Sequence, residues 1–416
     1  MISKILINKS LVWLYIFYLV YTPVIISSIY FDKYFTIPII TILLLIPYII
    51  RKDNSIIKIL MHKNIIILML TVFSLSVYFT LVQTINNIEI QNILDYRLIQ
   101  NNLINFLIIN IAIISDKLSR LGYSKKDALE ILLKIGAIQG VICVVSIFFL
   151  PLKDIAVQLY ANTGGINEFV IGSRVFGISN DYTFGTPIYH GMLAGIGLYY
   201  AIKNKVNYYP YIALILFASI MNGRTGILVF IIFYLGIIVH NLLIGNLKYA
   251  KKPLLAILLV SVLMVGAIQY VAPSSYNFIS ILVQDTNNLI FKKELTGNYE
   301  ALNQSISLPS GNALIYGAGH RVYADKASEY ETTSSDIGFI NDLYMIGIVL
   351  SIVFYITILY FLRYRSTEDK FLMTALFIIL MFANIKGEVF RSSIVMFLVI
   401  YTKIILDSKY TDKIHE

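Results

Sequence analysis

Charged residues and cysteine are scarce in this 416-residue chain. Only 14% of the residues are charged, whereas 58% are apolar. A soluble core cannot enclose so much evenly distributed apolar surface, so we expect lipid to act as the solvent. Cys143 is the single cysteine and falls within an apolar run. This excludes a disulfide framework and a thiol metal site.

Motifs that bind nucleotides or metals are also missing. The sequence contains no Walker-type loop, no HExxH pair and no other metal-ligand spacing. Gly317-Ala318-Gly319 is not a dinucleotide fingerprint, because no strand is expected before it and no third glycine follows at the required offset. We interpret it as a turn. We therefore expect no metal, no cofactor and no nucleic-acid partner.

Long apolar runs separated by short polar links dominate the chain. One bilayer crossing needs about 20 largely apolar residues, and about twelve such runs occur. The predicted spans are 10–30, 34–50, 65–83, 98–115, 128–150, 183–202, 206–221, 225–245, 253–272, 336–362, 370–385 and 388–406. The sequence therefore predicts an all-α, polytopic integral membrane protein in which 1–416 forms a single membrane domain.

Basic residues predict the orientation of these spans. The tail and loops on one side hold 21 lysines and arginines, and those on the other hold 11. Basic residues in short loops stay in the cytoplasm, so we expect both termini there. The two longest predicted loops, 151–186 and 273–335, then lie on the outer side, where loops carry function disproportionately. Within the second, apolar stretches at 278–283 and 289–291 predict short helices at the membrane face.

Arginine is concentrated on that outer side. It supplies 4 of the 21 inner basic residues but 5 of the 11 outer ones. Because the same outer segments hold 15 acidic residues, a broad positive field does not explain this bias. Individual guanidinium groups, which match phosphate oxygens in a bidentate way, are the alternative. The outer arginines are Arg97, Arg174, Arg224, Arg321 and Arg391.

Two of these arginines stand in glycine-flanked segments where backbone can approach a ligand. Arg174 follows Gly172-Ser173, and Arg224 lies in Asn222-Gly223-Arg224-Thr225-Gly226. Arg174 has the alternative of an ordinary solvated loop charge. Arg224 has the alternative of a side chain that snorkels to the membrane interface. Both interpretations stay open from the sequence.

The remaining candidates follow the glycine turn. His320 is the only histidine in a predicted outer loop, so it is a candidate to exchange a proton or to donate to phosphate, or else it is simply solvated. Arg321 is its neighbour. Asp336 opens a predicted span, where it either caps the helix or serves as a base at the membrane surface.

Polar residues inside the predicted spans have structural explanations. Four asparagines between 101 and 110 are expected to join helices by hydrogen bonds. Glu130 and Lys134 are four residues apart on one predicted helix and are expected to pair. We expect His190 to be satisfied by its neighbours.

The ordered set of outer motifs resembles the O-antigen polymerase and O-antigen ligase superfamily. These motifs are Arg-Val-Phe-Gly (174–177), Asn-Gly-Arg-Thr-Gly (222–226), Tyr-Gly-Ala-Gly (316–319), Ser-Asp-Ile-Gly-Phe-Ile-Asn (335–341) and Tyr-Met-Ile-Gly-Ile (344–348). The resemblance covers 170–360 by motif and the rest by hydropathy. It implies a bacterial inner-membrane glycosyltransferase of the type that uses polyprenyl-phosphate sugars (GT-C), with its active site on the outer, periplasmic face.

Such enzymes transfer a glycan from undecaprenyl pyrophosphate to a sugar hydroxyl without metal or nucleotide. The resemblance therefore implies that Arg174 and Arg224 hold the donor pyrophosphate and that Asp336 or His320 serves the acceptor hydroxyl. Arg321, Tyr316 and Arg391 are expected to bind substrate. The expected partners are the lipid-linked donor and acceptor glycans and the bilayer, and a chain-length regulator protein is left open.

Two departures from the family pattern affect this interpretation. Ligases of the family carry a histidine shortly before the span that follows the large loop, where this chain has Asp336. This favours a polymerase of surface polysaccharide, O-antigen or capsule, over a ligase. Many relatives also carry an arginine after a glycine where this chain has Thr296-Gly297-Asn298. A flippase for lipid-linked oligosaccharide is the alternative from another class, and it is less favoured because the notable charges lie at the predicted surface.

Overall fold

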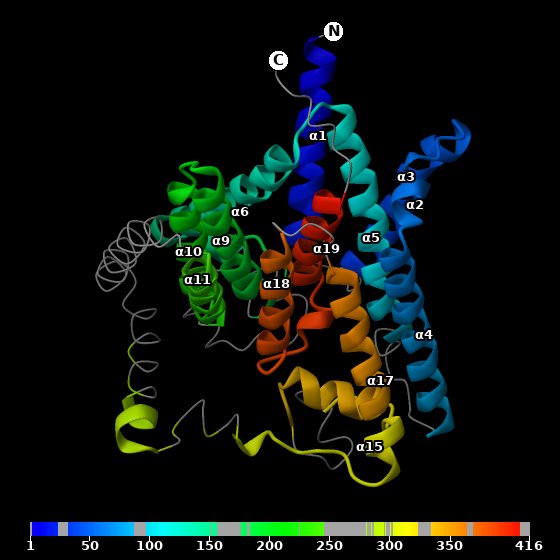
Figure 1. The fold of residues 1–416 in the computed structure, drawn as a ribbon, viewed down its shortest axis with the longest axis vertical. Coiled ribbons are helices and arrows are strands. Elements are labelled where there is room, and N and C mark those ends of the chain that lie inside the picture. The colour runs from blue at the N-terminus through cyan, green and yellow to red at the C-terminus, as the bar shows by residue number, and fades with distance from the viewer. Residues whose placement is uncertain are drawn as a thin grey trace.

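The computed structural model describes a helical bundle (Figure 1). The described residues are 2–23, 32–86, 97–149, 151–155, 175, 177–180, 184–223, 225–244, 280, 284, 287–294, 296, 300, 303–322, 334–363 and 369–407. Every regular element among them is helical. The predicted all-α class is therefore confirmed for this part of the chain.

The described helices differ widely in length. They are α1 (Ile2–Tyr21), α2 (Asp32–Ile50), α3 (Ser55–Leu60), α4 (Lys63–Ile85), α5 (Arg97–Arg120), α6 (Lys125–Phe148), α9 (Gly185–Asn204), α10 (Tyr209–Asn222), α11 (Thr225–Leu243), η3 (Asn288–Lys292), α15 (Asn312–Tyr316), α17 (Gly338–Leu362), α18 (Lys370–Ala383), η4 (Val389–Arg391) and α19 (Ser393–Asp407). Apart from η3 (a π-helix) and η4 (a 3₁₀-helix), all are α-helices.

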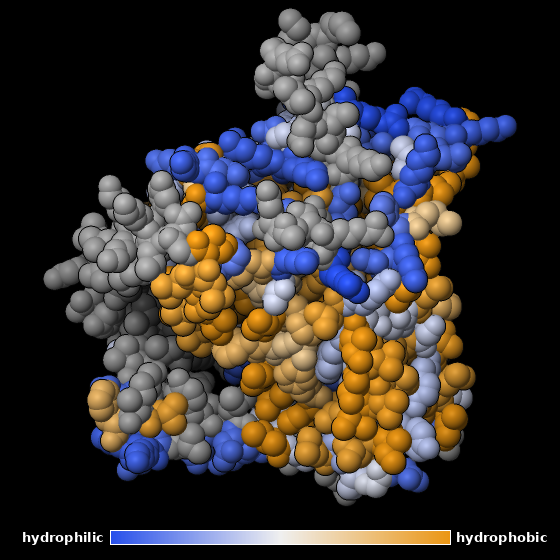
Figure 2. Space-filling view, viewed as in Figure 1, coloured by the Kyte–Doolittle hydropathy of each residue, from blue (hydrophilic) through white to orange (hydrophobic). Residues whose placement is uncertain are grey.

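Six of the described helices are long and apolar enough to cross a membrane, namely α2, α4, α5, α6, α11 and α17. Figure 2 shows apolar residues spread over much of the visible surface, below a hydrophilic region toward the upper end. On α2 the side chains of Phe35, Ile42 and Leu43 are each more than half exposed. Surface of this kind is suited to lipid contact, and the chain belongs to the membrane-embedded class. The predicted span 253–272 lies outside the described residues.

Several predicted boundaries are wrong. The first helix ends at Tyr21 instead of continuing to about residue 30, and Thr22 after it adopts a φ of 36°. The last helix begins at Ser393, so Arg391 precedes it, in η4, instead of lying within the span.

The most consequential difference is a break within α17. Gly347 adopts φ 73° and ψ 173°, which divides the helix into a first arm, 338–346, and a second arm, 348–362. Figure 1 shows the first arm crossing the direction of the second at the end of the bundle where α15 lies, which we call the α15 end. The predicted span over 336–362 is therefore not one continuous helix, although its length and hydropathy still suit a membrane crossing.

The glycine turn after α15 packs into this break. Gly317 and Gly319 have φ of 85° and 81°, so the predicted turn is confirmed. The backbone N–H groups of Ala318 and Gly319 both donate to the carbonyl of Tyr344, at 2.6 and 3.0 Å. A Cβ added at Gly347 would lie 2.1 Å from the carbonyl oxygen of Ile315. Close backbone approach, which only glycine permits, joins the two segments.

Two amides join helices, and one ion pair forms within a helix, as the sequence predicts. Asn110 Nδ2 donates to Thr41 Oγ1 at 2.6 Å, which links α5 to α2. Asn105 Nδ2 donates to the carbonyl of Met69 at 3.3 Å, which links α5 to α4. Lys134 Nζ lies 2.7 Å from Glu130 Oε1 on α6.

Candidate functional site

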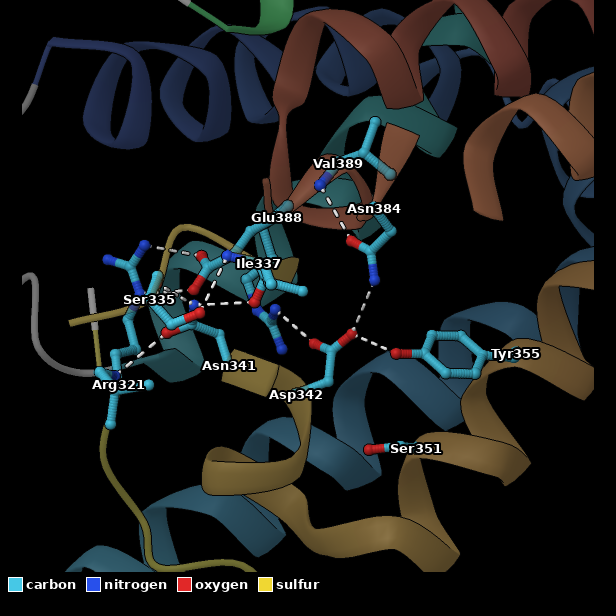
Figure 3. Close-up of polar contacts among 12 residues, drawn as sticks. Arg321, Ser335, Ile337, Asn341, Asp342, Ser351, Tyr355, Asn384, Glu388 and Val389 are labelled. Atoms are coloured by element: carbon cyan, nitrogen blue, oxygen red, sulfur yellow. Dashed lines mark hydrogen bonds and ion pairs between the residues drawn. The ribbon is translucent and has the colours of Figure 1, made fainter. Parts of the chain in front are cut away.

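Three chain segments meet near the α15 end, and we call their meeting place the junction. It consists of residues 320–322, 335–342 and 384–391. Figure 3 shows the network of polar contacts that connects them.

Asn384 connects the first arm of α17 to the turn after α18. Its carbonyl accepts from the N–H of Gly338 at 2.8 Å, and its Nδ2 donates to Asp342 Oδ2 at 3.2 Å. Its Oδ1 accepts from the N–H of Val389 at 3.2 Å. A Cβ at Gly338 would come within 2.2 Å of that Oδ1, so glycine is required for this approach.

Asp342 forms the buried centre of the junction. Its side chain is fully buried, and Arg391 Nη1 lies 2.6 Å from its Oδ1. The hydroxyl of Tyr355, from the second arm of α17, donates to its Oδ2, as Figure 3 shows. A buried carboxylate needs such partners, because the ionised group would otherwise lose its hydration uncompensated.

A second ion pair joins Arg321 to Glu388. The guanidinium Nε and Nη2 donate to the two carboxylate oxygens, each at 2.7 Å. This is the bidentate geometry in which an arginine uses its planar fork completely along one edge. The pair ties the chain after the glycine turn to the turn that leads into η4.

The two ends of the segment 323–333 are held together. The N–H of Ser335 donates to the carbonyl of Val322 at 2.6 Å, and the N–H of Val322 donates to Asn341 Oδ1 at 3.1 Å. Asp336 is exposed beside this contact. The N-cap of α17 is Ile337 and no side chain caps the helix, so the capping role predicted for Asp336 is wrong.

His320 is half-buried and packs against the first arm of α17. Its ring centroid lies 5.5 Å from that of Tyr344. Burial lowers the pKa of His320 below its ordinary value of 6.5, and a backbone hydrogen bond with Ala318 opposes that shift. The imidazole is therefore neutral at pH 7 and able to accept a proton.

Tyr316 presents its ring to the surroundings. Its side chain is 60% exposed, while its carbonyl accepts from the hydroxyl of Tyr78 on α4 at 2.7 Å. Asn86, just after α4, donates to the carbonyl of Ala318 at 2.8 Å. The end of α4 therefore fixes the backbone of the turn and leaves the Tyr316 ring accessible.

Arg174 and Arg224, the two arginines predicted to hold phosphate, lie outside the described residues. Their chain neighbours are described and lie together. The N–H of Val175 donates to the carbonyl of Met221 at 3.1 Å, three residues before Arg224. Both side chains belong to one buried cluster.

The α9–α10 region also reaches the junction. Phe184 directly precedes α9, and a Cβ added at Gly387 would lie 2.5 Å from its ring. Gly387 stands directly before Glu388, the partner of Arg321. The segments near Arg174 and Arg224 are thus connected through Phe184 to the segment that carries Arg391.

The sequence did not identify the carboxylates that engage Arg321 and Arg391. Asp342 falls inside the predicted span 336–362 and Glu388 inside 388–406, and the sequence assigned neither of them a partner. One signal was present in the sequence. Glu388 and Arg391 are charged residues about one helical turn apart, and they lie between two apolar runs. No sequence rule paired them with residues 67 and 49 positions away.

No cluster of three His, Cys, Asp or Glu side chains within the described ranges could hold a metal ion. No family model, no curated protein and no solved structure matches this chain. The fold and the junction therefore define its class at one level only: an all-helical, membrane-embedded protein with a buried polar network at the α15 end.

Proposed function

We propose that this protein is a membrane glycosyltransferase that polymerises oligosaccharide repeat units linked to undecaprenyl pyrophosphate. The product is a bacterial surface polysaccharide, either O-antigen or capsule. In this proposal the chain crosses the inner membrane about twelve times with both termini in the cytoplasm. The junction then faces the periplasm.

One observation carries the proposal: the motif-bearing segments converge. Val175 is bonded to Met221, Phe184 abuts Gly387, and Arg321 is paired with Glu388. The glycine turn packs into the break of α17, where Ala318 and Gly319 donate to the carbonyl of Tyr344. Motifs that the resemblance lists only in sequence order are thus in contact. Convergence of this kind is what a site built from several loops requires.

The proposed reaction joins two lipid-linked glycans. A hydroxyl of the acceptor sugar attacks the anomeric carbon of the donor sugar, a new glycosidic C–O bond forms, and the C–O bond to undecaprenyl pyrophosphate breaks. The hydroxyl proton passes to a base, for which neutral His320 and exposed Asp336 are the candidates. The pyrophosphate leaves with both bonding electrons.

Arg174 and Arg224 hold the leaving pyrophosphate in this proposal, because guanidinium groups stabilise the charge that develops there. Arg321 and Arg391 are already engaged by Glu388 and Asp342. Their contribution to substrate binding is therefore mainly to fix the junction. The exposed ring of Tyr316 supplies a flat face for a sugar.

The test is Arg224→Lys, assayed by polymer length in cells and by turnover of purified protein in liposomes. We expect loss of most activity at normal membrane insertion, because a point charge does not replace the bidentate fork. Lys126→Arg, a change in a predicted cytoplasmic loop, serves as the control. Wild-type activity in Arg224→Lys would exclude the clamp.

A deletion strain separates the proposal from its alternatives. Polymerase loss should leave single repeat units on the cell surface. Accumulation of long, unattached polymer would indicate a ligase, and trapping of lipid-linked units on the cytoplasmic side would indicate a flippase.

A further inference from the structure

A short segment that directly follows Arg174 is fixed at several points to the surrounding helices. This segment, Val175 and residues 177–180, is bonded to α10 through the N–H of Val175 and the carbonyl of Met221 at 3.1 Å. Ser179 Oγ is hydrogen-bonded to Thr186 Oγ1 on α9. We call it the 175–180 segment.

Two further contacts hold the same segment to α6 and α1. Gly177, with φ 58°, is so close to α6 that an added Cβ would lie 2.5 Å from Nε2 of Gln139. The N–H of Asn180 donates to the carbonyl of Tyr21 at 2.9 Å. Tyr21 is the last residue of α1, where helix carbonyls lack an intrahelical partner, so this bond also completes the helix end.

Tyr21 differs from the other residues that hold the segment because its side chain makes a second hydrogen bond, to α9. Its hydroxyl is hydrogen-bonded to His190 Nε2 on α9 at 2.9 Å, and both side chains are fully buried. Its backbone thus holds the segment while its side chain fixes the end of α1 against α9. A phenylalanine would fill the same space without this directional constraint.

The neighbouring Tyr189 provides an internal comparison. It is also fully buried, and its ring lies edge-on to that of Tyr21 with centroids 5.9 Å apart. Its hydroxyl has no hydrogen-bond partner within the described part of the chain. One buried tyrosine of this pair therefore uses its hydroxyl to orient a helix end, and the other does not.

We propose that Tyr21, held by His190, is a positioning residue for the 175–180 segment. This segment directly follows Arg174 in the chain, the residue that the proposed function assigns to the donor pyrophosphate. The expected effect of Tyr21 on catalysis rests on the proposed function. The expected effect of Tyr21 on the position of the 175–180 segment does not. A displacement of about 1 Å at a positioned group is enough to cost about a hundredfold in rate.

The first experiment measures the segment itself, without any activity. Asn180→Cys adds a thiol in the segment, and the sole native cysteine, Cys143, is buried and gives little background. The rate of labelling by a membrane-impermeant maleimide is then measured with Tyr21→Phe or with Tyr189→Phe in the same protein. We expect the rate to change at least about threefold with Tyr21→Phe and to stay unchanged with Tyr189→Phe, since one net hydrogen bond is lost in the first case alone. Equal rates in the two variants would overturn the proposal.

The second experiment measures turnover in liposomes. We expect Tyr21→Phe to lower kcat about tenfold with little change in KM, whereas Tyr189→Phe retains wild-type kcat. His190→Gln places an amide near the position of Nε2 and should retain more activity than His190→Leu, which offers no partner. Loss in both His190 variants to the same extent would show that the bond to Tyr21 is not what His190 contributes.

The two experiments fail separately. If no variant and no wild-type protein shows glycosyl transfer, the proposed function fails while the labelling result still decides the positioning role. If transfer occurs and Tyr21→Phe matches Tyr189→Phe in both assays, the function stands and the positioning role is excluded.

Discussion

Asp342 and Arg391 show how a single buried charge depends on its partners. Each of these charged side chains would be costly to bury without the other. The carboxylate receives the guanidinium, an amide and a phenol, so that its lone pairs are satisfied. The pair keeps the first arm of α17 against η4.

Removing one partner of this pair should destabilise the protein strongly. Asp342→Ala leaves the guanidinium of Arg391 buried without its counter-charge, and we expect a loss of about 3–5 kcal/mol in the free energy of unfolding. Glu130→Ala, which removes the more exposed contacts with Lys134 and with the Tyr208 hydroxyl, is the control with an expected loss of about 1 kcal/mol. Thermal unfolding in detergent measures both.

The double variant Asp342→Ala with Arg391→Met completes this test. It removes both charges and should recover part of the lost stability, because no isolated charge remains buried. A double variant as unstable as Asp342→Ala alone would contradict the ion-pair explanation.

His320 gives a prediction about pH. Because burial lowers its pKa below 6.5, the folded protein binds fewer protons at His320 than the unfolded chain does as pH falls through 6.5. Protonation of His320 therefore lowers the free energy of unfolding as the pH falls below 6.5. If His320 is the base, transfer activity should fall only below pH 6.5, as the imidazole becomes protonated.

His320→Gln should remove this acidic limb and lower the rate by about a hundredfold or more. Rate measurements between pH 5 and 8 in liposomes decide the point. An unchanged acidic limb in His320→Gln would assign the titration to another group, and Asp336→Asn is the next variant to measure.

At the scale of the element, the break in α17 is set by backbone contact. Gly347 has a positive φ and lies against the carbonyl of Ile315, so a side chain there meets both conformational strain and a steric clash. Ser351 Oγ donates to the carbonyl of Gly347 at 2.7 Å and supports the start of the second arm. The turn after α15 and the break in α17 form one unit.

Gly347→Ala should disrupt the contact between the turn after α15 and the break in α17. We expect a loss of about 2–5 kcal/mol in stability from strain and clash together. Gly311→Ala is the matched control, since Gly311 has φ 57° but nothing within 4 Å of an added Cβ. It should cost about 1 kcal/mol from strain alone. Equal losses, measured by thermal unfolding, would show that the clash contributes nothing.

At the scale of the whole molecule, the proposed topology places the loop after α2 and the loop before α15 on opposite sides of the membrane. Lys52 and Leu308 are both exposed. In intact cells an impermeant maleimide should label Leu308→Cys but not Lys52→Cys, and both should react after permeabilisation. Labelling of Lys52→Cys in intact cells would reverse the assigned orientation.

The sequence alone determined the helical, membrane-embedded character of the chain, because hydropathy over about 20 residues is a local property. It also predicted the Gly317–Gly319 turn, the amide contacts of Asn105 and Asn110, and the Glu130–Lys134 pair. Each of these depends on neighbours along one helix or on a polar group that must find a partner in apolar surroundings.

Only the tertiary structure decided where α17 breaks and which carboxylates engage Arg321 and Arg391. Gly347 lies within an uninterrupted apolar run, so hydropathy continues across the break. Its conformation follows from the backbone of Ile315, which reaches it only in the fold. The pairing of Asp342 with Arg391 likewise depends on where the first arm of α17 meets η4. Such contacts are fixed by packing between segments distant in the chain, because no periodic pattern along the sequence specifies them.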